Sequence, residues 1–70
     1  MERQPVKSSN IRSVGYDPAT RTLEIEFSAG GVYHYVNLAP VVHAALMKAP
    51  SKGIYLEARV KNRYRRKKVS

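Results

Sequence analysis

The residues of this sequence that could take part in binding chemistry are mostly cationic, and they gather near the C-terminus. Positions 48 to 70 hold nine lysines and arginines against one acidic residue, Glu57, whereas the first 47 residues hold four basic and four acidic residues. The last third of the chain therefore carries the whole net charge of +8. Such an asymmetry predicts a polyanionic partner, either a nucleic acid or another acidic surface.

These cations begin on a predicted helix and continue beyond it, a pattern that suits contact with a phosphate backbone. We therefore expect a nucleic-acid-binding domain. The side chains expected to contact phosphates are Lys52, Arg59, Lys61, Arg63, Arg65, Arg66, Lys67 and Lys68. Two alternatives stay open. The chain could be a protein-interaction module that uses its basic arm on an acidic protein surface, or the charges could only increase solubility.

Tyr33 and Tyr35 are the aromatic residues that could read bases. Residues two apart in a strand point to the same side, so both rings share one face. They could form a stacking platform for unpaired bases. They could equally cover the apolar face of the sheet, and the small size of the core favours this structural role.

The residues expected of an enzyme or a metal site are missing from the sequence. There is no cysteine and no Gly-x-Ser-x-Gly motif, and Glu24 and Glu26 fall on the polar side of a predicted strand. His34 and His43 are the only histidines, and they stand in no zinc-binding pattern. We expect no catalysis, no metal and no small-molecule cofactor.

The elements that position these residues follow from hydrophobic periodicity. Strands are predicted over 11–16, 22–27 and 32–36, the second with strict alternation of apolar and polar residues. Asp17-Pro18 and Gly30-Gly31 provide turns between them. The three strands then form an antiparallel meander with one covered face.

Helical character follows the strands. Pro40 suits the first position of a helix that runs to position 49, and Pro50 ends it. Ser51 can cap a second helix, in which Leu56, Val60 and Tyr64 form one apolar stripe. The 70 residues thus predict one α+β domain, a three-stranded meander packed against one or two C-terminal helices. Its core covers about 7–64, and residues 65–70 form a basic tail that we expect to be mobile unless bound.

The absence of cysteine and of any long apolar run predicts a cytoplasmic protein with no membrane contact. With disulfides excluded, the remaining support for so small a core is close packing or oligomerisation.

Several short motifs together resemble the KTSC domain family, which is named for the C-terminus of some lysyl-tRNA synthetases. They are Ser8-Ser9-Asn10-Ile11, Gly15-Tyr16-Asp17, Leu23 to Phe27, Gly30-Gly31, Tyr33-His34-Tyr35 and Ala49-Pro50-Ser51-Lys52-Gly53 with Tyr55. Tyr55-Leu56-Glu57 departs from the Tyr-Phe-Asn that often follows in the family. The resemblance spans about Lys7 to Tyr64 and implies the family's fold. The fusion to synthetases implies RNA, ahead of DNA, as the partner.

Overall fold

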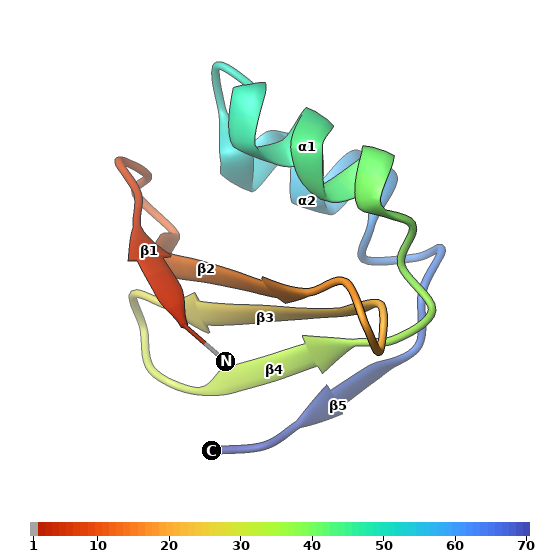
Figure 1. Ribbon diagram of the computed structural model, residues 1–70. Helices are drawn as coiled ribbons and strands as arrows, with labels where there is room; N and C mark the ends of the chain where they lie inside the picture. Colours follow the sequence, from red (N-terminus) through yellow and green to blue (C-terminus); the bar gives the residue numbers. More distant parts are fainter. Residues whose placement is uncertain (1) are drawn as a thin grey trace.

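The chain folds as a curved antiparallel sheet with two helices on one of its faces (Figure 1). The structure is a computed structural model, and it describes residues 2–70. Its elements are β1 (Arg3–Pro5), β2 (Ile11–Asp17), β3 (Thr22–Phe27), β4 (Val32–Tyr35), α1 (Pro40–Lys48), α2 (Lys52–Arg59) and β5 (Arg66–Lys68). The five strands lie in sequence order, each antiparallel to the next. The predicted α+β class is confirmed.

The central meander follows from the alternation in β3. Leu23 and Ile25 are fully buried on the helix-covered face, and Glu24 and Glu26 lie on the opposite, open face. Gly30 and Gly31 take φ angles of 109° and 90°, which suit glycine in the turn to β4. Because a residue and its direct partner share a face, the register of Ile25 with Tyr33 places the tyrosines on the helix side.

The two helices begin and end near the predicted positions. Pro40 starts α1, and the Ser51 side chain caps α2 by accepting a hydrogen bond from the Ile54 N–H at 3.3 Å. Leu56 and Val60 are buried as predicted, but α2 ends at Arg59. Tyr64 packs on the core from the turn that follows and not from the helix.

The core lies between the sheet and the helices, and its residues come from every element except the two edge strands. It consists of Ile11, Val14, Leu23, Ile25, Tyr35, Leu38, Leu46, Leu56 and Val60. Burial of these side chains is the main force that holds α1 and α2 against the sheet. Among residues 2–70, neither helix has the length and apolar character needed to cross a bilayer.

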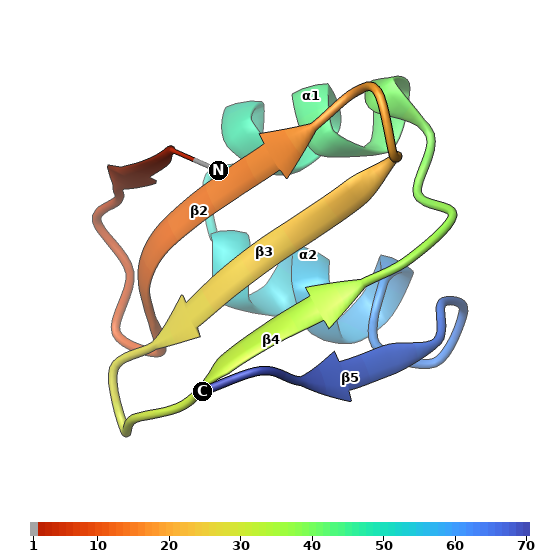
Figure 2. The same cartoon turned by 60° about the horizontal axis from the view of Figure 1, so that its bottom comes forward.

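The sheet is wider than predicted, since β1 and β5 extend the meander at its two edges. The expectation of a mobile tail is corrected by β5, which pairs with β4 (Figure 2). The Val36 N–H donates to the Arg65 carbonyl at 3.1 Å, and the Val32 N–H donates to the Ser70 carbonyl at 3.0 Å. The side chains of β5 are exposed and show no apolar alternation. This strand therefore forms by backbone pairing with the free edge of β4. The hydrophobic periodicity of the sequence cannot predict such a strand.

Candidate functional site

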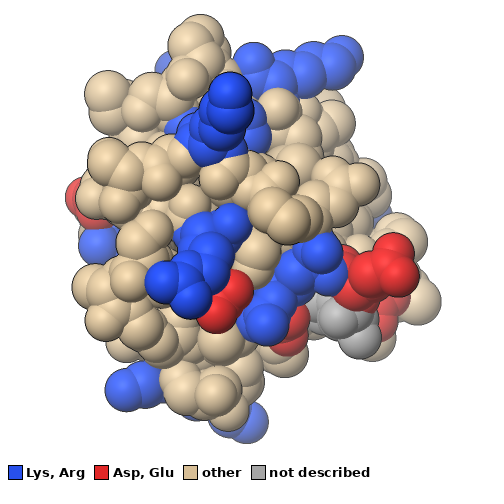
Figure 3. Space-filling view, turned by 90° about the vertical axis from the view of Figure 1, so that its left-hand side faces the viewer, with Lys and Arg blue, Asp and Glu red and all other residues tan. Residues whose placement is uncertain are grey.

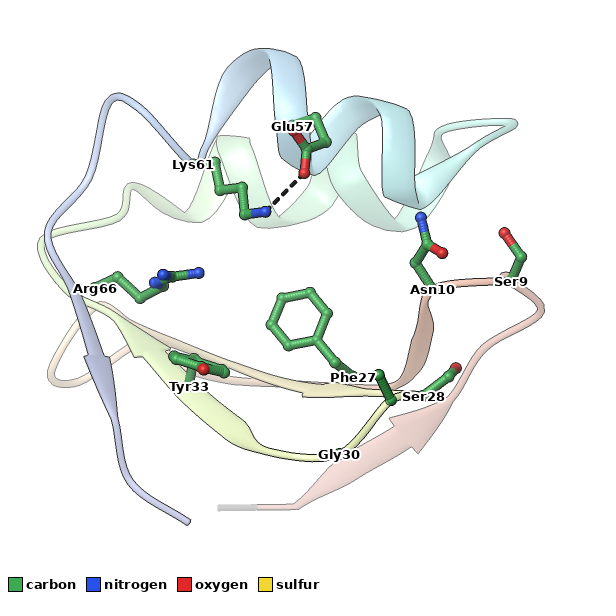
Figure 4. Close-up of a pocket in the computed structure, with 10 residues that line it drawn as sticks. Ser9, Asn10, Phe27, Ser28, Gly30, Tyr33, Glu57, Lys61 and Arg66 are labelled. Atoms are coloured by element: carbon green, nitrogen blue, oxygen red, sulfur yellow. Dashed lines mark hydrogen bonds and ion pairs between the residues drawn. The ribbon is translucent and has the colours of Figure 1, made fainter.

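A pocket of about 380 Å³ opens between α2 and the β3–β4 hairpin (Figure 4). The rings of Phe27 and Tyr33 lie on its sheet side, and Glu57 and Lys61 project from the helix side. Arg66 closes one end of the pocket, and Asn10 lies toward the other. Ser9, Ser28, Ala29 and Gly30 complete the lining. The site thus combines an aromatic surface with two cations.

Strand register explains how Arg66 reaches this pocket. Arg66 lies opposite the buried Tyr35 and so faces the helices, whereas Lys67 lies opposite His34 on the open face. The Arg66 guanidinium carbon is 4.6 Å from the centroid of the Tyr33 ring, within the range of a cation–π interaction. Tyr33 in turn packs edge-on against Phe27, with ring centroids 5.5 Å apart. The guanidinium therefore lies over one ring of an aromatic pair.

The second cation of the pocket is held by a carboxylate one helical turn away. Lys61 Nζ lies 2.7 Å from Glu57 Oε1, an i,i+4 pair. Glu57 is 63% exposed, so water screens this pair. The two cations outnumber the single carboxylate, and the pocket is net positive.

A second pocket, of about 350 Å³, lies beside the first at the start of α2. The two share the lining residues Ser9, Asn10 and Glu57. We call the two pockets together the α2 groove. A Cβ added to Gly53 would lie 3.4 Å from Asn10 Nδ2, so the loop before β2 lies within contact distance of the start of α2. Lys7 and Lys52 line this second pocket.

Comparison with known proteins shows the family to which this fold belongs. The family model described as the KTSC domain matches residues 7–64. The chain belongs to the KTSC domain family. The structure of a KTSC domain protein from Yersinia pestis is similar, with a TM-score of 0.96 and 40% sequence identity, and the match covers 99% of this chain and 97% of that one.

Relatives of this KTSC domain include both short and long proteins. An uncharacterized protein from Stutzerimonas stutzeri is 47% identical over 53 residues, which are 76% of this chain and 75% of the relative. A lysine–tRNA ligase from Nostoc punctiforme is 36% identical over 64 residues, which are 91% of this chain but only 11% of the ligase. The family match ends at position 64, so Phe27, Tyr33 and Lys61 lie within it and Arg66 lies beyond it.

The structure separates the predicted contact residues into two groups. Lys52, Lys61 and Arg66 line the α2 groove of the KTSC domain, together with Tyr33. The other predicted cations line neither pocket; they are Arg59, Arg63, Arg65, Lys67 and Lys68. The α2 groove therefore takes in three of the eight predicted cations.

The two tyrosines predicted as a possible stacking platform lie in different environments. Tyr35 has no exposed surface and belongs to the core, so its ring is not available for base stacking. Tyr33 is only partly buried and faces the pocket. Phe27, Asn10 and Lys7 were missed as site residues, although Asn10 stands in one of the family motifs and Phe27 ends the clearest strand.

On one face of the molecule, positive charge lies in separate groups. In Figure 3, lysine and arginine side chains occupy several areas of one face, with carboxylates and uncharged surface between them. The α2 groove is distinguished by cations that adjoin an aromatic ring and a cavity.

The two histidines have structural partners. His34 Nε2 lies 2.7 Å from Glu24 Oε1, and His43 stacks on Tyr16 with ring centroids 4.6 Å apart. Desolvation by burial lowers the pKa of His43 below its ordinary value. Within residues 2–70 there is no group of three or more side chains of the types that hold a metal ion.

Proposed function

We propose that this KTSC domain is a non-catalytic module that binds single-stranded RNA in the α2 groove. The observation that carries the proposal is the position of Arg66, whose guanidinium lies over Tyr33 in a pocket also lined by Lys61. Cations beside a partly exposed aromatic ring match the needs of a flexible strand, which offers phosphates and unstacked bases together.

Single strands are favoured over duplexes because the cations lie along a groove beside α2, which is bounded on its other side by the β3–β4 hairpin and by the loop before β2. Four of them line it, namely Lys7, Lys52, Lys61 and Arg66. Bases in a duplex are stacked and paired and could not enter such a pocket, whereas those of a single strand can turn outward. RNA is favoured over DNA because several relatives are lysine–tRNA ligases, whose name states that tRNA is their substrate.

The test is fluorescence anisotropy with a labelled ten-nucleotide RNA and a duplex of the same sequence. If the four groove cations each neutralise one phosphate, the logarithm of the association constant should fall with the logarithm of salt concentration at a slope of about −2.8. The double variant Lys61→Ala/Arg66→Ala should weaken RNA binding by about tenfold or more, since two charged contacts are lost.

Lys67→Ala and Arg59→Ala are matched controls, because each removes one cation outside both pockets. If these controls weaken binding as much as single substitutions at Lys61 and Arg66, the groove is not the site. A polyglutamate chain that competes as well as RNA at equal charge would favour the acidic protein surface as the partner. Binding insensitive to salt would reject the proposal.

A further inference from the structure

We propose that the pocket between α2 and the β3–β4 hairpin receives one unpaired nucleotide. In this arrangement the base packs on Phe27 and the Arg66 guanidinium, and Lys61 faces the phosphate. The inference deepens the proposed function, because it assigns a nucleoside monophosphate unit to one part of the α2 groove. It also makes a claim of its own, since a pocket of this kind should bind a free mononucleotide.

The dimensions of the pocket set the size of the ligand. Its volume of about 380 Å³ lies near the lower end of the range found for small-molecule sites. The pocket is bounded by the helix on one side and the hairpin on the other (Figure 4). One nucleotide suits this space, whereas successive stacked bases need an extended surface such as an open sheet provides. Here the helix-covered face of the sheet is occupied by the core.

The flat surfaces in the pocket suit a base. Tyr33 supports the Arg66 guanidinium from one side, at 4.6 Å from its ring centroid, and both belong to the pocket lining. A base can therefore extend this stack on the second side of the guanidinium plane, because such planes stack on bases as aromatic rings do. The Phe27 ring, set edge-on to Tyr33, supplies an apolar wall next to it.

Polar groups at the two ends distinguish the base from its phosphate. Lys61 and Arg66 against Glu57 leave a net positive charge toward one end. Toward the other end lies the Asn10 carboxamide, which within residues 2–70 has no side-chain hydrogen bond. An amide both donates and accepts, so it can pair with the polar edge of a base. A ligand with a phosphate and no base would interact only with the cationic end of the pocket.

The test is an NMR titration of the labelled full-length protein with adenosine monophosphate, ribose 5-phosphate and the dinucleotide ApA. We expect adenosine monophosphate to bind at least fivefold more tightly than ribose 5-phosphate, with the largest shifts at Phe27, Gly30 and Tyr33. Tighter binding of ApA than of the monophosphate would identify the ligand as part of a chain, and equal or weaker binding would identify it as a free nucleotide. Both results support a nucleotide pocket.

Arg66→Lys separates stacking from charge, because lysine keeps the cation and lacks the guanidinium plane. The variant should bind adenosine monophosphate several-fold more weakly and ribose 5-phosphate unchanged. Arg66 is exposed on the edge strand β5, so the substitution does not enter the core. Lys67→Arg, on the open face of the same strand, is the control and should alter neither affinity.

Two results would overturn the inference. They are equal affinities for adenosine monophosphate and ribose 5-phosphate, and an Arg66→Lys variant that binds the monophosphate like the parent protein. In either case salt-dependent RNA binding through phosphates could still hold. Conversely, binding of adenosine monophosphate without binding of RNA would support the nucleotide pocket and contradict the proposed function.

Discussion

Arg3 and Glu24 form an ion pair although their strands are not neighbours. Arg3 Nη1 lies 3.2 Å from Glu24 Oε2, with the whole width of β2 between β1 and β3. Register explains the contact, because Gly15 of β2 is the direct partner of both Arg3 and Glu24 and has no side chain to separate them. The other Glu24 oxygen contacts His34 of β4. One carboxylate thus connects three strands across the open face.

Glu24→Gln should therefore lower the free energy of unfolding by about 1 kcal/mol, because a carboxylate with only 15% exposure loses its ion pair with Arg3 and exchanges its contact with His34 for a neutral one. Urea denaturation of Arg3→Ala, Glu24→Ala and the double variant would give the coupling between the first pair. We expect 0.5 to 1 kcal/mol, roughly the upper range for exposed pairs. Additive single effects would show that the contact contributes nothing to stability.

Two tyrosine hydroxyls with opposite environments give a matched pair of substitutions. The buried Tyr35 hydroxyl has no hydrogen-bond partner within residues 2–70, whereas the Tyr16 hydroxyl donates to the Leu38 carbonyl at 2.6 Å. Tyr35→Phe should leave stability unchanged or raise it by up to about 1 kcal/mol, and Tyr16→Phe should lower it by about 1 kcal/mol. Chemical denaturation measures both. A loss in Tyr35→Phe as large as that in Tyr16→Phe would contradict the assignment.

His43 should make the domain less stable in mild acid. Burial lowers the pKa of His43 in the folded state, so as pH falls the unfolded chain takes up this proton first. The unfolded state then binds more protons, and stability falls below about pH 6.5 until the folded state is protonated too. Urea denaturation at pH 7.5 and at lower pH measures this loss. The same series on His43→Gln should show a smaller loss, and equal losses would exclude His43 as the cause.

Glu57→Gln should strengthen RNA binding in the α2 groove. The substitution removes the carboxylate that pairs with Lys61 and raises the positive charge of the pocket. At low salt we expect about threefold tighter binding, a gain that salt should diminish. Stability should change by less than about 0.5 kcal/mol, since the pair is largely exposed. Anisotropy and urea denaturation measure the two effects, and weaker RNA binding would contradict this role of Glu57.

Removal of residues 66–70 should destabilise the domain without unfolding it. All nine buried core side chains lie between positions 11 and 60, so the core stays complete. The lost backbone hydrogen bonds to β4 should cost about 2 kcal/mol. Thermal denaturation followed by circular dichroism tests this. The triple variant Arg66→Gln/Lys67→Gln/Lys68→Gln keeps the backbone and should lose less; an equal loss would mean that the side chains hold the strand.

Local patterns predicted the centre of this fold well. The alternation of Leu23 and Ile25 with glutamates, the Gly30-Gly31 turn and the capping Ser51 each depend on neighbouring residues in the chain. The edge strands depend instead on backbone groups far away in sequence. The sequence of β5 shows no pattern that indicates its pairing with β4. Its exposed cationic side chains are compatible with a strand and with an irregular segment alike.

The candidate site was predicted only in part for a related reason. Charge counting found Lys52, Lys61 and Arg66 but could not separate them from Arg59 or Lys67, since position relative to a groove requires the folded register. Tyr33 and Tyr35 share one face, yet the folded packing buries Tyr35 completely and leaves Tyr33 in the pocket lining. Such differences arise from packing and not from residue type.

The place of Arg66 on an edge strand would link the proposed ligand binding to local opening of the sheet. When β5 detaches, the Val36 and Val32 amide protons lose their acceptors on residues 65 and 70 and become open to exchange with solvent. A ligand held by Arg66 binds only the attached form, and by mass action it must slow that exchange. Slower deuterium uptake at these two amides would therefore report that the pocket is occupied.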